Sequence, residues 1–425
     1  MFLFIIGILV FIAAFYFIIS EKLPSPYATL GAGLLMALAG ILNQEEMMEA
    51  IAGRLEVILL LVAMMIIVWI ISETGFFQWF AIKVAQLVRG NPIALIAILS
   101  TVTAVCSAFL DNVTTILLMA PVSILLAKQL ELSAFPFLMS EVMGANIGGA
   151  ATLIGDPTQL ILGSEGKLSF NDFIMNTSPM AIIALIALIC TVYLIYRKEL
   201  VVSNELKARI MELDPSRSLK DVKLLKKALL IFGIVILGFV LNNFLNKGLA
   251  VISLSGAVVL MIVAKKTPHE AFKAVEWDTL FFFIGLFIMV KGLENIHIIE
   301  MVGEKLVHVT EGHFKLATML VMWVSAAFAS ILGNVATATT FSQIVHFMEP
   351  HFTGVNTQVL WWALSFGACL GGNLTILGAA TNVVAVSVGD KAGMKIGFVQ
   401  FMKFSTVIVL QSLLLASGYM LIRYF

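Results

Sequence analysis

Long apolar segments separated by short polar stretches run through almost the whole chain. About 20 apolar residues in a helix are enough to cross the hydrocarbon core of a bilayer. We interpret ten segments as membrane crossings: 2–19, 28–43, 56–72, 136–163, 177–196, 228–246, 248–264, 279–292, 358–388 and 404–422. The pattern therefore predicts an all-α polytopic membrane protein with about ten transmembrane helices.

Two further apolar segments, 92–127 and 316–346, are too long for a single crossing. Each holds a polar Asn-Val pair near its middle, at Asn112 in the first and Asn334 in the second. A polar turn in the middle of an apolar segment predicts a chain that enters the membrane, turns and leaves on the same side. We therefore expect two re-entrant hairpins with these motifs at their tips.

The tip motif and a second, glycine-rich motif each occur twice. Residues 110–115 (LDNVTT) recur as 332–337 (LGNVAT), and residues 144–155 (GANIGGAATLIG) recur as 367–378 (GACLGGNLTILG). Duplicated polar motifs inside apolar helices are typical of transporters that bind their substrate at the interface of two repeats. The sequence therefore predicts a secondary transporter built from two repeats.

The glycine-rich motifs lie inside the long segments 136–163 and 358–388, which we expect to be broken helices at the bilayer midplane. Non-helical backbone is tolerated there only where protein or a watery cavity satisfies its polar groups. Glycine permits positive φ and close backbone approach. The predicted helix-break glycines are Gly148, Gly149, Gly155, Gly371, Gly372 and Gly378.

Charge placement predicts the topology. The polar stretch 197–227 carries nine basic residues, which indicates a cytoplasmic loop. If the chain changes sides at each predicted crossing before and after this loop, 19 basic residues lie on the cytoplasmic side and seven on the external side, and both termini are external. The first hairpin then enters from the cytoplasm and the second from outside, so the two repeats are inverted and their tips can meet near the midplane.

These assignments divide the chain into five parts. They are N-terminal scaffold helices at 1–54, repeat 1 at 55–196, the basic linker at 197–227, further scaffold helices at 228–278, and repeat 2 at 279–425.

Asp111 and Asp156 are the only carboxylates within the four motifs. An ionisable residue at membrane depth indicates function, because burying its charge is costly. We therefore predict that Asp111, with Asn112 and Asp156, binds a coupling ion or proton. The alternative for both aspartates is a helix N-cap, and it is stronger for Asp156, which precedes a proline.

Neutral polar residues surround these aspartates in the motifs. Interhelical hydrogen bonding would account for a few of them, but their pairing across two repeats favours a site. The predicted substrate-binding residues are Thr114, Thr115, Asn146, Thr152, Asn334, Thr337, Asn373, Thr375 and Asn382. No lysine or arginine lies in the motifs, so a multiply charged anion would need cations or helix dipoles to balance it.

Composition excludes several other classes of protein. With 60% hydrophobic and 12% charged residues, the chain is not a soluble domain. The 26 basic and 26 acidic residues cancel, so no nucleic-acid partner is indicated. The three cysteines have no metal-ligand spacing, so we expect no bound metal. An intramembrane aspartyl protease would need glycine where Leu153 stands, and no nucleophile–base pair is apparent, so we expect no enzyme.

Several of these motifs resemble those of the arsenite/antimonite permease and P-protein (pink-eyed dilution) family of the ion transporter superfamily. The resemblance spans essentially the whole chain, and its motifs are 72–77 (SETGFF), 107–115 (SAFLDNVTT), 146–157 (NIGGAATLIGDP) and 361–373 (WWALSFGACLGGN). It implies a transport domain of two hairpins and two broken helices that moves against a scaffold in an elevator-like cycle. One departure is Gly333-Asn334, where P-protein-like members often have a second Asp-Asn.

The resemblance, with a site that lacks basic residues, favours proton-coupled export of arsenite or antimonite, because arsenite is mostly an uncharged hydroxide at neutral pH. The alternatives are a sodium/proton antiporter and a sodium-coupled carboxylate or other anion carrier. A passive channel is an alternative of another class, since tip-to-tip hairpins can line a pore.

We expect no cofactor apart from a coupling proton or sodium ion, and we place the protein in the cell (inner) membrane as a multi-pass protein. The expected partners are the lipid bilayer and a small ion or molecule as substrate. The resemblance adds a homodimer and, for an arsenite pump, a soluble ATPase.

Overall fold

The computed structural model describes residues 2–20, 22–310 and 312–425, and all of the regular elements in those ranges are helices. The first half of the chain holds α1 (Phe2–Ile19), α2 (Ser25–Leu38), α3 (Gln44–Ala52), α4 (Leu55–Glu73), α5 (Phe76–Leu87), α6 (Pro92–Phe109), α7 (Asn112–Gln129), α8 (Phe135–Gly149), α9 (Pro157–Glu165), α10 (Phe170–Asn176) and α11 (Ser178–Tyr196). A linker with α12 (Asn204–Met211) and η1 (Pro215–Ser218) follows.

The second half holds α13 (Val222–Val240), α14 (Asn242–Leu245), α15 (Leu249–Ala264), α16 (Pro268–Ala274), α17 (Trp277–Asn295), α18 (Ile298–Val309), α19 (Phe314–Leu332), α20 (Asn334–Met348), η2 (Glu349–His351), α21 (Gln358–Gly371), η3 (Ile376–Gly378), α22 (Ala380–Lys391) and α23 (Phe398–Tyr424). Seven of the described helices are long and apolar enough to cross a membrane. An eighth candidate is the pair α17–α18, which bends by 69°. The predicted all-α polytopic fold is confirmed.

The two halves repeat each other helix by helix. α4 and α17 begin at Leu55 and Trp277, 222 residues apart, and α9 and α22 begin at Pro157 and Ala380, 223 residues apart. The correspondence extends to α3 and α16, each of which begins with a capping box, at Asn43 in the first half and Thr267 in the second. The structural duplication therefore includes helices that the sequence assigned to the scaffold.

The halves interlock through two pairs of parallel helices. α2 lies against α17, where Thr29 donates a hydrogen bond to the Phe282 carbonyl near the start of both helices. α15 lies against α4 in the same manner, and Lys266 pairs with Glu73 where both helices end. The first helices of each half thus pack on the other half, which holds the repeats in their inverted relation.

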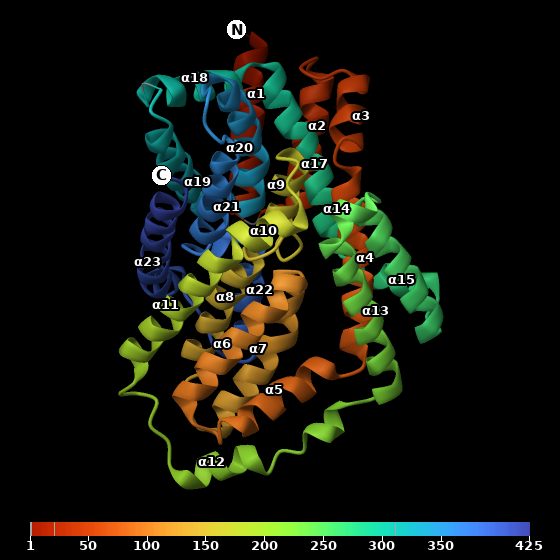
Figure 1. The fold of residues 1–425 in the computed structure, drawn as a ribbon, viewed down its shortest axis with the longest axis vertical. Coiled ribbons are helices and arrows are strands. Elements are labelled where there is room, and N and C mark those ends of the chain that lie inside the picture. Colours follow the sequence, from red (N-terminus) through yellow and green to blue (C-terminus); the bar gives the residue numbers. More distant parts are fainter. Residues whose placement is uncertain (1, 21, 311) are drawn as a thin grey trace.

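Two helical hairpins approach each other from opposite ends of the molecule, as Figure 1 shows for α6 and α7 below and α19 and α20 above. At the first tip only Leu110 and Asp111 separate the two arms. At the second tip a single residue, Gly333, reverses the chain with a φ of 90°. Glycine adopts this conformation without the steric penalty that a side chain would add. The predicted hairpins and their tips are confirmed.

Both predicted broken helices are also present. α8 ends at Gly149 and α9 begins at Pro157, while α21 ends at Gly371 and α22 begins at Ala380. None of the six predicted glycines has a positive φ, so that part of the prediction is wrong. They are needed for close approach instead: a Cβ on Gly148 would collide with the backbone of Ala104, and one on Gly371 with Ala326.

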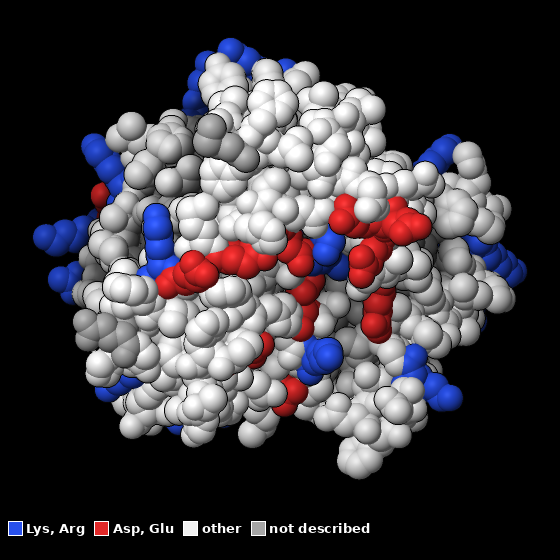
Figure 2. Space-filling view, turned by 90° about the horizontal axis from the view of Figure 1, so that it is seen from above, with Lys and Arg blue, Asp and Glu red and all other residues white. Residues whose placement is uncertain are grey.

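The linker defines one end of the molecule. Lys220 donates its backbone N–H to the Thr74 carbonyl at the end of α4, and Gln86 of α5 hydrogen bonds to the Leu213 carbonyl. We call this the linker end. α1–α3 and α18 lie at the opposite end, where acidic side chains form a band across the face in Figure 2. The basic linker and the acidic opposite face fit the predicted orientation, which stays a prediction.

Substitution of either tightly packed glycine tests this account of the fold. We expect Gly148→Ala and Gly371→Ala each to lower the free energy of unfolding by roughly 3 kcal/mol, because the added methyl group meets rigid backbone. Gly233→Ala is the matched control, since a Cβ there has no neighbour within 4 Å. Thermal unfolding of the purified variants measures the effect, and equal melting temperatures for all three would contradict the proposed packing.

Candidate functional site

Asp156 joins the tips of both hairpins. Its Oδ2 accepts a hydrogen bond of 2.7 Å from Asn112 of the first tip and one of 3.0 Å from Asn334 of the second. Its Oδ1 accepts the backbone N–H of Thr158 and so caps α9. The sequence left open whether Asp156 is a cap or part of a site. In the structure it is an N-cap and also the point where two residues 222 apart in the sequence converge.

Asp111 is the N-cap of α7. Its Oδ2 accepts hydrogen bonds of 2.8 Å from both the backbone N–H and the hydroxyl of Thr114. Asp111 therefore has the helix N-cap role that the sequence analysis gave as the alternative to ion binding. The residue is only partly buried, however, and it also lines the cavity described below. Its role in binding an ion or proton stays a prediction.

A chain of amides connects the breaks of the two long helices. Asn112 donates to Asn146 Oδ1 at 3.2 Å, and Asn146 donates to Asn373 at 2.7 Å and to Asn382 at 2.9 Å. Asn382 in turn donates to the carbonyls of Gly372 and Thr375 in the second break. These asparagines are buried, and Asn382 satisfies two carbonyls that the second break leaves without helical partners.

The predicted threonines bond mainly to the backbone. The hydroxyls of Thr152 and Thr375 donate to the carbonyls of Ala108 and Ser330, which ties each break to the neighbouring hairpin arm. The hydroxyls of Thr115 and Thr337 donate to carbonyls at their own tips, namely those of Asp111 and Gly333. Their contacts are therefore those of structural residues, and a substrate contact stays a prediction.

A cavity of about 550 Å³ opens beside the two tips. Of the residues predicted for the site, four line it: Asp111, Asn112, Asp156 and Asn334. The other eight predicted substrate-binding residues are not among its described lining residues: Thr114, Thr115, Asn146, Thr152, Thr337, Asn373, Thr375 and Asn382. The rest of the wall comes from the α1–α2 connection, the start of α17, and α22.

The cavity is acidic. Glu276 and Asp278, at the start of α17, line it together with Asp111 and Asp156, and no lysine, arginine or histidine is among its described lining residues. Glu276 precedes the α17 crossing. Burial raises its pKa to about 7, and the negative charge of Asp111 contributes to the rise. Four carboxylates around one cavity repel each other unless protons or cations neutralise them.

The sequence reasoning missed Glu276 and Asp278 because they lie outside all four motifs, between the first glycine-rich motif and the second hairpin tip. It also missed two threonines that follow the helix breaks at equivalent positions, Thr158 and Thr381. Each is fully buried, and within the described structure each hydroxyl oxygen lacks a hydrogen-bond partner. Extending the repeat alignment three residues past the second motif would have paired them.

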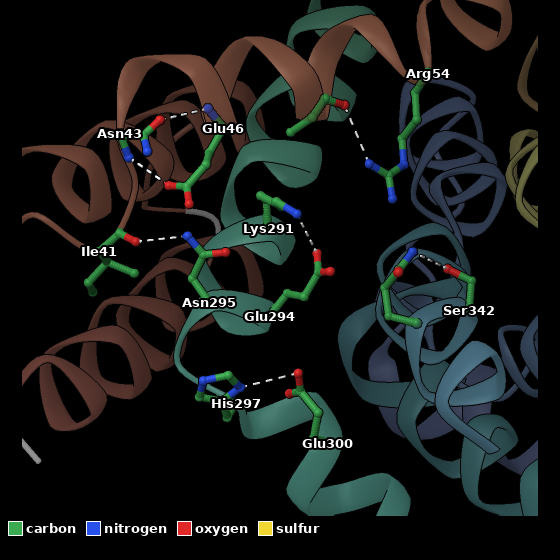
Figure 3. Close-up of polar contacts among 12 residues, drawn as sticks. Ile41, Asn43, Glu46, Arg54, Lys291, Glu294, Asn295, His297, Glu300 and Ser342 are labelled. Atoms are coloured by element: carbon green, nitrogen blue, oxygen red, sulfur yellow. Dashed lines mark hydrogen bonds and ion pairs between the residues drawn. The ribbon is translucent and has the colours of Figure 1, made fainter. Parts of the chain in front are cut away.

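Polar contacts connect α4, α9 and α20 at the end of the molecule opposite the linker. Arg54, at the start of α4, forms an ion pair of 2.7 Å with Glu165, the last residue of α9, and Gln343 of α20 donates to the same carboxylate at 3.0 Å. Figure 3 shows Arg54 and Ser342 to the right of the pairs Lys291–Glu294 and His297–Glu300. The Arg54–Glu165 pair therefore bridges two helices at the end opposite the linker.

Comparison with known proteins finds membrane transporters among the relatives of this chain. A family model described as a citrate transporter, CitMHS, matches residues 15–367. A 46 kDa membrane protein of Mycobacterium leprae is 36% identical, with 99% of both chains aligned. An uncharacterised transporter of Mycobacterium tuberculosis is also 36% identical over 99% of both chains. The human P protein is 33% identical over 87% of this chain and 53% of its own length.

A solved structure shares the fold. The YdaH transporter of Alcanivorax borkumensis, whose structure is described as having an unusual topology, superposes with a TM-score of 0.55 over 90% of both chains. The two sequences are 12% identical, so this likeness concerns the fold alone.

Loss of the charge at Asp156 tests whether the site binds a cation. A ligand that binds only the folded protein raises its melting temperature, so we expect sodium chloride to stabilise the unmodified protein more than choline chloride does. Asp156→Asn keeps the shape of the side chain and should abolish this difference. Asp390→Asn, at an exposed position of α22, should retain it. A sodium-specific shift that survives in Asp156→Asn would contradict a cation site at this carboxylate.

Proposed function

The chain belongs to the CitMHS citrate transporter family, and from this membership together with the acidic cavity we propose that this membrane transporter exchanges sodium ions for protons. Asp111 and Asp156 hold the sodium ion or the protons in turn. Asn112 and Asn334 bring the two hairpin tips to the same carboxylate. From the sequence we preferred arsenite, because the motifs resemble those of the arsenite permease and P-protein family and contain no basic residue. The structure adds two carboxylates to the cavity, those of Glu276 and Asp278, and they favour a cation as substrate.

The observation that carries this proposal is the charge of the cavity. Asp111, Asp156, Glu276 and Asp278 face one space, and its described lining has no basic side chain. An ion moved into a low-dielectric interior loses several kcal/mol of hydration, which nearby opposite charges must offset. A sodium ion gains that compensation here, whereas an anion meets repulsion. Protons compete for the same carboxylates, and this competition is the basis for exchange.

The cavity and the Arg54–Glu165 ion pair lie toward opposite ends of the molecule, and this arrangement supports alternating access. The cavity is lined by the start of α2 and the start of α17, both of which lie toward the linker end because α2 and α17 run parallel away from it. The Arg54–Glu165 pair lies at the other end, where it connects α4 to α9. We propose that this is the state open to the cytoplasm, and that the hairpins and broken helices move as one body against the remaining helices.

Two other substrates remain candidates for specific reasons. Arsenite or antimonite, as an uncharged hydroxide, would not be repelled by the carboxylates and would find amide groups at Asn112 and Asn334. Citrate is in the description of the family model. Its three carboxylates would meet four more in the cavity, so we expect it to enter only together with cations that neutralise its charge.

Proton flux in proteoliposomes distinguishes these candidates. With a pH-sensitive dye inside, we expect an imposed sodium gradient to move protons the opposite way in the unmodified protein. Asp111→Asn should reduce the rate at least 10-fold, because an amide exchanges no proton, while Asp390→Asn should leave it unchanged.

The remaining outcomes of this assay are equally decisive. A proton flux that requires arsenite, or that requires citrate with a divalent cation, would replace sodium/proton exchange with that substrate. An undiminished sodium response in Asp111→Asn would overturn the role given to this residue.

A further inference from the structure

A second carboxyl group is buried in repeat 1, away from the cavity. Glu141 lies on α8 with an exposed fraction of 0%. Its Oε1 accepts hydrogen bonds from the hydroxyls of Ser123 on α7 and Thr103 on α6. Its Oε2 is also buried and has no hydrogen-bond partner among the described residues. Two hydroxyls therefore converge on one oxygen, and the other oxygen is free to carry a proton.

No opposite charge reaches this carboxyl group. The helices packed against α8 are α6, α7, α11, α21, α22 and α23. The charged side chains on them or at their caps are Asp111, Lys128, Arg197, Asp390, Lys391, Lys403 and Arg423, and their other titratable side chains are Cys106, Cys190, Tyr193, Tyr196, Cys369, Tyr419 and Tyr424. Hydrogen bonds and ion pairs of Glu141 within the described structure involve only Ser123 and Thr103. A buried carboxylate without a counter-charge costs several kcal/mol, and this cost favours the protonated form of Glu141.

The second repeat shows that the fold does not require this group. By the offset of the glycine-rich motif, Leu364 stands where Glu141 stands in the first repeat, and it is also fully buried. Val345 takes the place of Ser123, and the hydroxyl of Ser325, in place of Thr103, bonds within its own helix to Met322. An apolar packing therefore fills the same position.

Glu141 is separate from the cavity and lies toward the linker. It precedes Gly149, the last residue of α8, by eight residues, which is about 12 Å along a helix that rises 1.5 Å per residue. The loop before α8 is tied to the linker, because Glu131 pairs with Arg209. A proton on Glu141 thus lies between the helix break and the linker end of repeat 1.

We propose that Glu141 is a second proton-binding site of this transporter, distinct from Asp111 and Asp156, which exchanges its proton with water at the linker end. The step is loss of the proton from Oε2 to water, leaving a carboxylate that keeps both hydroxyl donors on Oε1. This inference rests on the proposed function, because it adds one proton to those exchanged in each cycle.

Infrared spectroscopy tests the proton directly and does not depend on the substrate. The purified protein should show a carbonyl stretch of a protonated carboxyl group that shifts in heavy water, and Glu141→Gln should lack it. Glu199→Gln, at an exposed position before the linker helix, is the matched control and should retain it. Absence of this band from the unmodified protein, or a band that never exchanges its proton, would overturn the proposal.

Flux measurements then separate this inference from the proposed function. In proteoliposomes we expect Glu141→Gln and Glu141→Leu to retain sodium transport and thermal stability, to move one proton fewer in each transport cycle, and to show a flatter pH profile. A proton ratio and pH profile equal to those of the unmodified protein would reduce Glu141 to a structural role. Absence of sodium-driven flux in the unmodified protein would instead contradict the proposed function, and the infrared result would still decide the status of Glu141.

Discussion

The meeting of two hairpin tips at one carboxylate is the interaction on which the rest of this structure depends. Asp156 can accept from Asn112 and Asn334 at once only because α8 ends at Gly149 and leaves the next residues free to turn. Polar side chains satisfy the backbone of this break, because Gln159 and Thr177 donate to the carbonyls of Ala150 and Ala151. Each feature requires the others, so the polar residues of the motifs form one connected unit inside an apolar protein.

The two repeats share an architecture but divide the chemistry unequally. Asp111, Asp156 and Glu141 lie in repeat 1, and the equivalent positions in repeat 2 are Gly333, Ala379 and Leu364, which carry no carboxyl group. Repeat 2 supplies amides, carbonyls and a compact glycine turn. We propose that the motif carboxylates of the first repeat, together with Glu276 and Asp278 at the start of α17, carry the proton and cation chemistry, and that the second repeat completes the site and provides the inverted geometry that alternating access needs.

Much of this could be predicted from the sequence, because a constant offset between repeated motifs carries three-dimensional information. The hairpins, both tips and both breaks follow from that repeat, whereas the contacts of Asp156 with Asn112 and Asn334 are visible only in the structure. The cavity wall could not be predicted, since Glu276 and Asp278 reach it only through the packing of α17 on α2. The role of the threonines could not be predicted either, because a hydroxyl can bind a ligand or donate to a backbone carbonyl. The structure shows that Thr152 and Thr375 donate to carbonyls.

We propose that the acidic cavity holds a monovalent cation at Asp111 and Asp156. Diffraction from crystals soaked in a thallous salt tests it most directly, because thallium(I) substitutes for light monovalent cations and scatters anomalously. The account predicts an anomalous peak in the cavity beside these two carboxylates, and loss of that peak in Asp111→Asn. A cavity without thallium at saturating concentration, or an unchanged peak in the variant, would contradict it.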